Sequence, residues 1–95
     1  MNGFEWDAEK NSANFAKHGI SFEEAVTIWD GPVLTGQDEV LDFEVRERSF
    51  GLIGAIVVVC VIHTERDGKT RIISARKATK NERREFDAYL KNARS

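Results

Sequence analysis

A long apolar stretch followed by a tight turn constrains the fold of this chain more than any other feature. Residues 52–62 are almost entirely apolar, and Asp67-Gly68 follows shortly after them. The Asp-Gly dipeptide favours a two-residue hairpin turn, because both central residues of such a turn have positive φ. We therefore predict a strand over 56–64 that the hairpin joins to a strand over 69–77. The first strand is apolar on both faces, so it should lie in the middle of a covered sheet.

The hairpin also predicts which residues face one another across the two strands. If Arg66 pairs with Lys69, the pairs that share one sheet face are His63 with Ile72, Val61 with Ser74, and Val59 with Arg76. Strict alternation then places Arg71 and Lys77 on the face opposite to Arg76. The same alternation places Cys60 and His63 on opposite faces.

The N-terminal third predicts a short strand over 4–6 and two helices. Asp7 is a suitable N-cap for a helix that runs to about Lys17 and stops at Gly19. Ser21 and Glu24 have the spacing of a capping box, which starts the second helix. The apolar face of that helix consists of Phe22, Ala25, Val26 and Trp29, and Asp30-Gly31-Pro32 prevents its continuation.

The pattern is irregular over residues 32–44 and regular in the segments that follow them. Residues 32–44 are acidic and irregular, with at most a short strand near Val33, and a β-rich strand follows over 45–50. Thr79 and Glu82 form a second capping-box pattern, which starts a C-terminal helix. The apolar stripe of that helix consists of Phe86, Tyr89, Leu90 and Ala93.

Size and composition indicate a single domain over residues 1–95. A chain of 95 residues that is 41% hydrophobic and 32% charged suits one modest core. We expect an α+β fold, in which a small antiparallel sheet carries two packed N-terminal helices and a C-terminal helix. The apolar run is shorter than the ~20 residues that span a bilayer, and the first residues lack a secretory signal. We therefore expect a cytoplasmic protein with no membrane partner, in which Cys60, the one cysteine, is a buried hydrophobe.

Positive charge is concentrated in one segment of an otherwise acidic chain. Residues 66–84 hold eight Lys/Arg and two Asp/Glu, whereas residues 1–65 hold four Lys/Arg and twelve Asp/Glu. Such a cluster at a junction between strand and helix indicates a phosphate-bearing partner. The alternative is that these side chains only solvate a sheet edge.

Four cations of this segment are candidates for phosphate contact: Arg71, Arg76, Lys77 and Lys80. The free N–H groups at the start of the helix after Thr79 add to their attraction for an anion. Arg76 is our preferred residue, because it ends a strand just before that helix.

Acid–base groups are harder to assign from spacing. His63 is about four residues from Arg76 in the predicted register, or ~13 Å at about 3.4 Å per residue, so a structural role suits it better. His18 is a possible acid or base, although simple capping of a helix C-terminus is an equal alternative. Glu47 and Arg48 offer a base and a cation, or a cross-strand ion pair. No compact set of ligands predicts a metal site or another cofactor.

Several blocks of the sequence together resemble the BrnT-type toxins of bacterial type II toxin–antitoxin systems, which have a RelE-like fold. These blocks are Phe4-Glu5-Trp6-Asp7, Lys10, Asn14, Lys17-His18-Gly19-Ile20-Ser21-Phe22-Glu23-Glu24-Ala25, Glu47-Arg48, Arg71-Ile72-Ile73-Ser74-Ala75-Arg76-Lys77-Ala78-Thr79 and Glu82-Arg83. The resemblance implies a small ribonuclease that cleaves messenger RNA and arrests translation. It also implies a ribbon-helix-helix antitoxin, whose dimer joins two toxins and binds operator DNA.

The resemblance carries site residues over at the matching cations. These are Arg71, Arg76 and Lys77, followed by Lys17, His18 and Arg48. Metal-free RNA cleavage needs charge stabilisation at the phosphate, a proton acceptor and a proton donor. We expect Arg76 to stabilise the phosphate, Arg71 and Lys77 to assist, and His18 or Glu47 to transfer protons. Phe86 occupies the place where a tyrosine is expected, so a tyrosine has no role in this hypothesis.

A second class of function fits the same residues. A non-catalytic protein-binding module would keep the fold, the antitoxin and nucleic-acid binding without cleaving RNA. The uneven charge disfavours a third possibility, an α/β domain without a ligand. RNA cleavage by the purified protein separates the first two, since a binding module leaves RNA intact.

Overall fold

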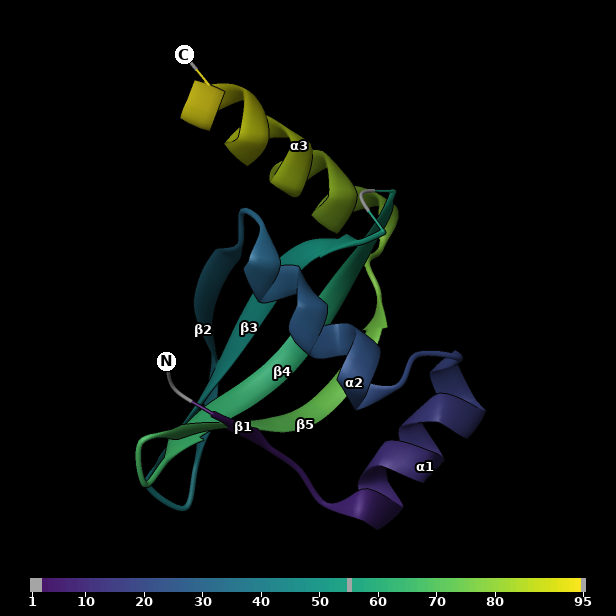
Figure 1. Cartoon of the computed structure of the whole chain (residues 1–95). Coiled ribbons are helices and arrows are strands. Elements are labelled where there is room, and N and C mark those ends of the chain that lie inside the picture. The colour runs from purple at the N-terminus through teal and green to yellow at the C-terminus, as the bar shows by residue number, and fades with distance from the viewer. Residues whose placement is uncertain (1–2, 55, 95) are drawn as a thin grey trace.

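Five strands form one mixed sheet in the order β1-β5-β4-β3-β2 (Figure 1). The computed structural model describes residues 3–54 and 56–94. The strands are β1 (Phe4–Glu5), β2 (Leu34–Leu41), β3 (Glu44–Ile53), β4 (Val57–Arg66) and β5 (Lys69–Lys77). The helical segments are α1 (Ala8–His18), α2 (Phe22–Ala25), the 3-10 segment η1 (Val26–Asp30) and α3 (Lys80–Arg94). None of the described helices is long and apolar enough to cross a membrane.

The sheet differs from the small antiparallel sheet that the sequence predicted. β1 pairs in parallel with β5, because the chain leaves β1 through helices and returns to it only after the other strands. The remaining neighbours are antiparallel. The predicted hairpin at Asp67-Gly68 is confirmed, with φ of 53° and 79° at its two central residues. β4 lies between β3 and β5, and its residues Val58 to Val61 are buried as predicted.

β2 is the element that the sequence did not show. It forms the edge of the sheet and pairs with β3 through a turn at Asp42-Phe43, both of which have positive φ. Most of its side chains are exposed, so its composition carries little apolar alternation. A bulge near Asp38 interrupts its pairing and further blurs the pattern.

A β-bulge in β5 corrects the predicted register. Ile62 pairs with Ser74, whereas His63 pairs with Ile72, so Ile73 is an extra residue in β5. The pairing of His63 with Ile72 is as predicted, but Val61 pairs with Ala75 and Val59 with Lys77. The pairs of Val61 with Ser74 and of Val59 with Arg76 were therefore wrong. Period-two alternation cannot reveal an inserted residue of this kind.

One face of the sheet, which we call the helical face, carries the main core. Its central residues on β4 are Val59, Val61 and His63. The core that covers them joins α2, η1 and the adjoining loop to the sheet, through Ile20, Phe22, Ala25, Ile28, Ile72 and Ala75. The second predicted helix is a single α turn continued by η1, because a tighter coil brings both Ile28 and the side of Trp29 onto the sheet.

The side chain of Asn14 and the absence of one at Gly51 hold the helical segments close to the strands. Asn14 of α1 bonds the backbone N–H and carbonyl of Ala75 at 3.1 and 2.9 Å, and also bonds the carbonyl of Ile20. This amide therefore satisfies part of the β5 backbone that has no strand beside it. Gly51 of β3 faces η1 so closely that a Cβ atom there would lie 2.6 Å from the Cβ of Ile28.

The opposite face, which we call the arginine face, contains Cys60, Ile62 and Thr64 of β4 and is covered by α3 at one end (Figure 1). Phe86 of α3 is fully buried there, and Tyr89 and Leu90 are half-buried. Ala93, which the predicted stripe included, is exposed because the end of α3 extends beyond the sheet.

Candidate functional site

Arginines from three neighbouring strands share the arginine face. In the observed register Arg48 pairs with Ile62, Arg71 with Thr64 and Arg76 with Cys60, and these β4 residues alternate onto one face. The same alternation adds two more arginines, and the full set is Arg46, Arg48, Arg66, Arg71 and Arg76. The bulge at Ile73 therefore brings Arg71 onto the face of Arg76, although simple alternation had placed them on opposite faces.

Each arginine of this set is close to a carboxylate. The nearest nitrogen–oxygen distances are 3.7 Å for Arg46 with Glu44, 3.5 Å for Arg48 with Asp38, 2.8 Å for Arg66 with Glu44, 3.2 Å for Arg71 with Glu5, and 2.8 Å for Arg76 with Glu82. Most of these pairs are partly exposed, so they contribute little to stability. They do reduce the positive potential of the face.

The pair between Arg76 and Glu82 has the best geometry of the set. Two guanidinium nitrogens, Nη1 and Nη2, donate to the two carboxylate oxygens at 2.8 and 3.0 Å. Glu82 also accepts from the backbone N–H of Thr79 at 2.8 Å, and its own N–H donates to the Thr79 hydroxyl at 3.2 Å. The predicted capping box is thus confirmed. Chiefly through the hydrogen bond from Arg76, the pKa of Glu82 falls to about 2.

A cleft of about 340 Å³ lies between β2, β3 and the first turns of α3. Its lining residues are Leu34, Thr35, Gly36, Arg48, Phe50, Glu82 and Glu85. We call it the β2–α3 cleft.

Cys60 is a fully buried thiol on the arginine face, where it packs in one cluster with Phe86. Burial is the main cause that raises the pKa of its thiol to about 11, so the thiol is no nucleophile at neutral pH. Four charged side chains also act on this pKa. They are Arg76, Glu82, Arg48 and Asp38.

The other predicted site residues lie elsewhere. Glu47 pairs with His63 and belongs to the helical face, as does Lys77, which pairs with Val59. Lys17 and His18 end α1, which lies beside β5 and α2 (Figure 1). Lys80 is exposed at the first turn of α3.

The structure therefore does not unite the predicted proton-transfer groups with the preferred cation. The sheet lies between Glu47 and Arg76, and the described hydrogen bonds of Arg76 go to Glu82 and to the carbonyl of Lys77, not to His18. Sequence reasoning missed Asp38, which lies in the bulge of an unrecognised strand, and Arg46. It used Glu82 only as a capping residue, although a carboxylate at that position also reaches an arginine that ends the preceding strand.

His63 has the structural role that the sequence favoured. Its Nε2 lies 2.6 Å from the Ser49 hydroxyl, which in turn lies 2.7 Å from the Thr35 hydroxyl. The Trp29 ring meets the imidazole edge-on, at a centroid distance of 5.1 Å. Burial lowers the pKa of His63 despite the opposing charges of Glu47 and Glu65. A buried, neutral imidazole of this kind is not exposed to a substrate.

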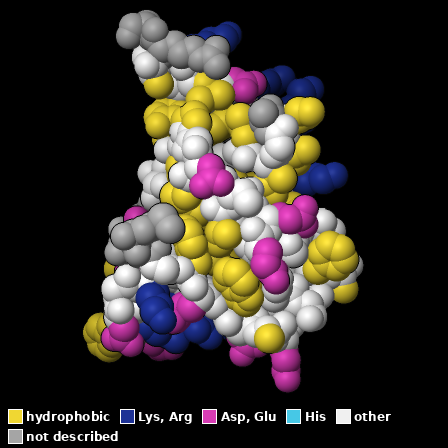
Figure 2. All heavy atoms as spheres, viewed as in Figure 1, with side chains coloured by type: hydrophobic (Ala, Val, Ile, Leu, Met, Phe, Trp, Pro, Cys, Tyr) yellow, Lys and Arg dark blue, Asp and Glu magenta, His cyan; other side chains and the backbone are white. Residues whose placement is uncertain are grey.

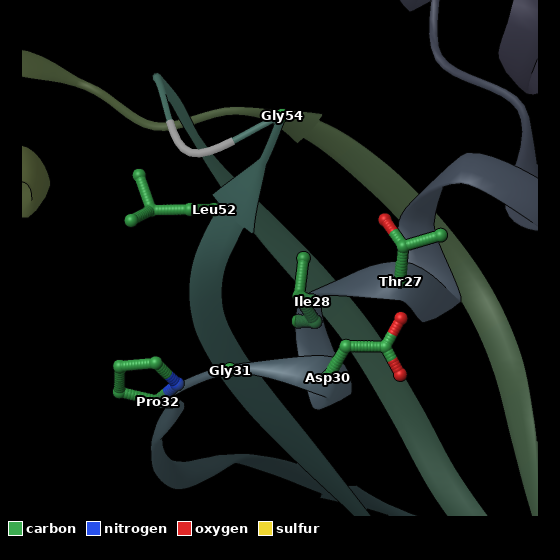
Figure 3. Close-up of a pocket in the computed structure, with 7 residues that line it drawn as sticks. All are labelled: Thr27, Ile28, Asp30, Gly31, Pro32, Leu52 and Gly54. Atoms are coloured by element: carbon green, nitrogen blue, oxygen red, sulfur yellow. The ribbon is translucent and has the colours of Figure 1, made fainter.

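A second cavity, of about 380 Å³, lies between η1 and the end of β3 (Figure 3). Among the described residues that line it, Asp30 is the one charged residue, and the close-up shows Leu52, Ile28 and Pro32 as its apolar walls. A lining whose described charged group is a carboxylate does not suit an anionic ligand. Figure 2 shows hydrophobic and acidic side chains among other atoms in the middle of the helical side, and Lys and Arg mainly towards its ends and edge.

Comparison with known proteins assigns the family. The model of the ribonuclease toxin BrnT of type II toxin–antitoxin systems matches residues 6–82. The chain belongs to the BrnT family. The matched segment contains Arg48, Arg71 and Arg76 and ends at Glu82, so most of α3 lies beyond it. No curated protein matches the chain.

The BrnT fold is also apparent from a solved structure. The crystal structure of the Brucella abortus ribonuclease toxin BrnT aligns with a TM-score of 0.63 and 20% sequence identity. The alignment covers 84% of this chain and 100% of that chain. The two proteins therefore share an α+β fold, here built on a five-stranded mixed sheet.

Proposed function

We propose that this BrnT family member is an endoribonuclease toxin that cleaves messenger RNA and inhibits translation, and that RNA binds in the β2–α3 cleft. One observation carries the proposal: Arg48 lines an open cleft, and Arg76 is hydrogen-bonded to Glu82, which lines the same cleft, in a chain of a ribonuclease toxin family. Arginine binds phosphate through paired, charge-assisted hydrogen bonds, so both side chains suit an RNA backbone.

The chemistry that fits this cleft needs no metal. The RNA 2′-oxygen attacks the adjacent phosphorus while a base removes its proton, and the P–O5′ bond breaks while an acid protonates O5′. The products are a 2′,3′-cyclic phosphate and a 5′-hydroxyl. Arg76 and Arg48 stabilise the negative charge that grows on the phosphate oxygens. Arg71, on the same face, contacts a phosphate further along the strand.

The proton-transfer groups belong to the arginine face. Glu82 is a poor proton acceptor, because its pKa is about 2 and its two oxygens are engaged by Arg76 and Thr79. Among the described residues, the remaining carboxylates here are Glu85, which lines the cleft, and Asp38, which pairs with the lining residue Arg48. They replace His18 and Glu47 in this proposal.

RNA cleavage by the purified protein tests the proposal directly. We expect cleavage to persist in EDTA and to fall about 10²–10³-fold in Arg76→Ala, as for the removal of an oxyanion-stabilising donor. Lys77→Ala is the matched control, since it removes a neighbouring cation from the helical face, and we expect a small effect. RNA that stays intact with the wild-type protein would contradict the proposal.

We also propose a ribbon-helix-helix antitoxin as the partner, with an antitoxin dimer that joins two toxins and binds operator DNA. Membership of a toxin–antitoxin family supports this partner. Induced expression with and without the neighbouring open reading frame tests it. Growth arrest that the neighbour relieves is expected, and light scattering of the co-purified complex gives its stoichiometry.

A non-catalytic binding module is the second candidate. The close pairing of the arginines with carboxylates favours it, because RNA must compete with these carboxylates for the face. Phe86 favours it as well, since its ring lacks a hydroxyl and is fully buried. RNA binding without cleavage, in a protein that still binds its antitoxin, would identify this function.

A further inference from the structure

The guanidinium group of Arg76 has two edges that can each bind a pair of oxygens, and Glu82 takes only one of them. The end-on edge, Nη1 with Nη2, donates to the carboxylate at 2.8 and 3.0 Å. The other hydrogen of Nη1 is directed to the carbonyl of Lys77 at 3.2 Å. Of the five N–H donors of an arginine, three are therefore in use among the described residues.

The two remaining donors form the side-on edge of the same guanidinium group. They are the Nε–H and the outer Nη2–H, which are parallel and spaced to meet two oxygens of one phosphate. The Arg76 side chain is 36% exposed, whereas that of Glu82 is 15% exposed. The arginine is thus the accessible member of the pair.

Glu82 is itself held rigidly. It occupies the N3 position of the capping box that starts α3, so the Thr79 N–H fixes one carboxylate oxygen and the Thr79 hydroxyl fixes the Glu82 N–H. Phe86, one helical turn further along α3, is completely buried against the arginine face. Because α3 is packed on the sheet, the Glu82 carboxylate has a fixed position, and its hydrogen bonds fix the Arg76 guanidinium group in turn.

We propose that Glu82 is a positioning residue, which holds Arg76 by one edge so that the other edge receives an RNA phosphate. This inference rests on the proposed function, because it takes RNA as the ligand of the cleft. It also opposes the simplest electrostatic view, in which Glu82 competes with the phosphate for Arg76. A carboxylate that competes weakens RNA binding, whereas a carboxylate that positions strengthens it.

The two views predict opposite signs for one substitution. The probe is an RNA oligonucleotide with 2′-O-methyl groups at every position, which the enzyme cannot cleave, and fluorescence anisotropy gives its dissociation constant. We expect Glu82→Gln to weaken RNA binding about tenfold. The substitution removes the charge-assisted pair of hydrogen bonds that orients Arg76. Glu85→Gln is the matched control. It removes the same charge from the same cleft without touching Arg76, so binding should become tighter.

A double substitution separates positioning from general damage to α3. If Glu82 acts through Arg76, Glu82→Gln causes no further loss in an Arg76→Ala background. An equal loss in both backgrounds would overturn the inference, because it would show a structural effect. Tighter binding or unchanged binding by Glu82→Gln alone would overturn it as well. If Arg76→Ala itself leaves binding unchanged, Arg76 does not bind the RNA phosphate and the proposed function is contradicted. That result is distinguishable from failure of the inference on Glu82, in which Arg76→Ala weakens binding and Glu82→Gln does not.

Nuclear magnetic resonance gives a second readout on folded protein. The Nε–H signal of Arg76, assigned by its loss in Arg76→Lys, should shift when the same oligonucleotide is added. In Glu82→Gln the shift should need a higher oligonucleotide concentration. A signal that does not move in the wild-type protein at saturation would show that the side-on edge is not the phosphate site.

Discussion

His63 shows how burial at a single residue links stability to pH. The folded protein holds its imidazole neutral, because burial lowers its pKa below the ordinary 6.5. Above pH 6.5 the ring is neutral in both states, so it has no effect on folding. Below pH 6.5 the unfolded chain binds a proton that the folded chain resists, and stability falls.

We therefore expect the free energy of unfolding to decrease between pH 7 and pH 5, and to decrease less in His63→Gln. Glutamine can bond the Ser49 hydroxyl but does not titrate. Urea denaturation at several pH values measures both curves. Parallel curves for the two proteins over this interval would contradict the assignment to His63.

Gly51 sets the distance between η1 and the sheet. A methyl group there would lie 2.6 Å from the Cβ of Ile28, which is fixed in the core. We expect Gly51→Ala to destabilise the protein by about 1–3 kcal/mol, measured by chemical denaturation, because overpacking forces the core to shift.

Gly36→Ala is the control for this substitution. Gly36 is also a strand glycine, but a Cβ atom there meets nothing within 4 Å. A similar loss of stability in both variants would point to glycine flexibility and not to the contact with Ile28.

At the scale of elements, Asn14 replaces a missing strand. Among the described residues, β1 is so short that it pairs only with Thr70 and Arg71, and the outer backbone of β5 at Ala75 bonds the Asn14 amide. Asn14→Ala removes these hydrogen bonds and leaves buried backbone groups unpaired. We expect a loss of about 2–4 kcal/mol in unfolding free energy.

Ser12→Ala, on the exposed side of the same helix, serves as the control and should be nearly neutral. Hydrogen exchange adds a local measurement. The Ala75 amide should exchange faster in Asn14→Ala, and an unchanged rate would show that another group protects this edge.

The elements differ in how much of them the sequence reveals. The caps at Asp7, Ser21 and Thr79 and the turn at Asp67-Gly68 depend on contacts between near neighbours, so their residue types predict them. β2 was not predicted from the sequence, because an exposed edge strand needs little apolar alternation. The bulge at Ile73 was not predicted, because it depends on the pairing of β5 with β4, and no local sequence pattern encodes that pairing.

The site was predictable to a similar extent. Arg48, Arg71 and Arg76 were named as cations from their positions, and the structure places all three on one face. The predicted proton-transfer groups lie on other parts of the fold than Arg76, Glu47 on the helical face and His18 at the end of α1. The partner of Arg76 was visible only as a capping residue, because sequence spacing does not show which way its carboxylate turns.

On the scale of the whole molecule, the proposed RNA contact depends on a few arginines in an acidic chain. The net charge is −2, so general attraction for RNA is weak and contacts with phosphates must carry it. If Arg48, Arg71 and Arg76 each neutralise one phosphate charge, the logarithm of the binding constant should fall with the logarithm of salt concentration with a slope of about −2.1.

Anisotropy titrations of the non-cleavable oligonucleotide over a range of KCl concentrations measure this slope. Arg76→Ala should reduce its magnitude by about 0.7, the value for one phosphate on a single strand. A slope that Arg76→Ala leaves unchanged would mean that its guanidinium group does not contact a phosphate.

The pairing of β1 with β5 also has a consequence for the order of events during folding. β3, β4 and β5 are joined by short turns and assemble from near neighbours, whereas Phe4 must find Thr70 across most of the chain. Closing so long a loop costs entropy that only the final contacts repay, so we expect β1 to dock last. Glu5 arrives with it. Before β1 docks, Arg71 therefore lacks its partner Glu5. In this late folding state the arginine face has a more positive potential than in the native protein.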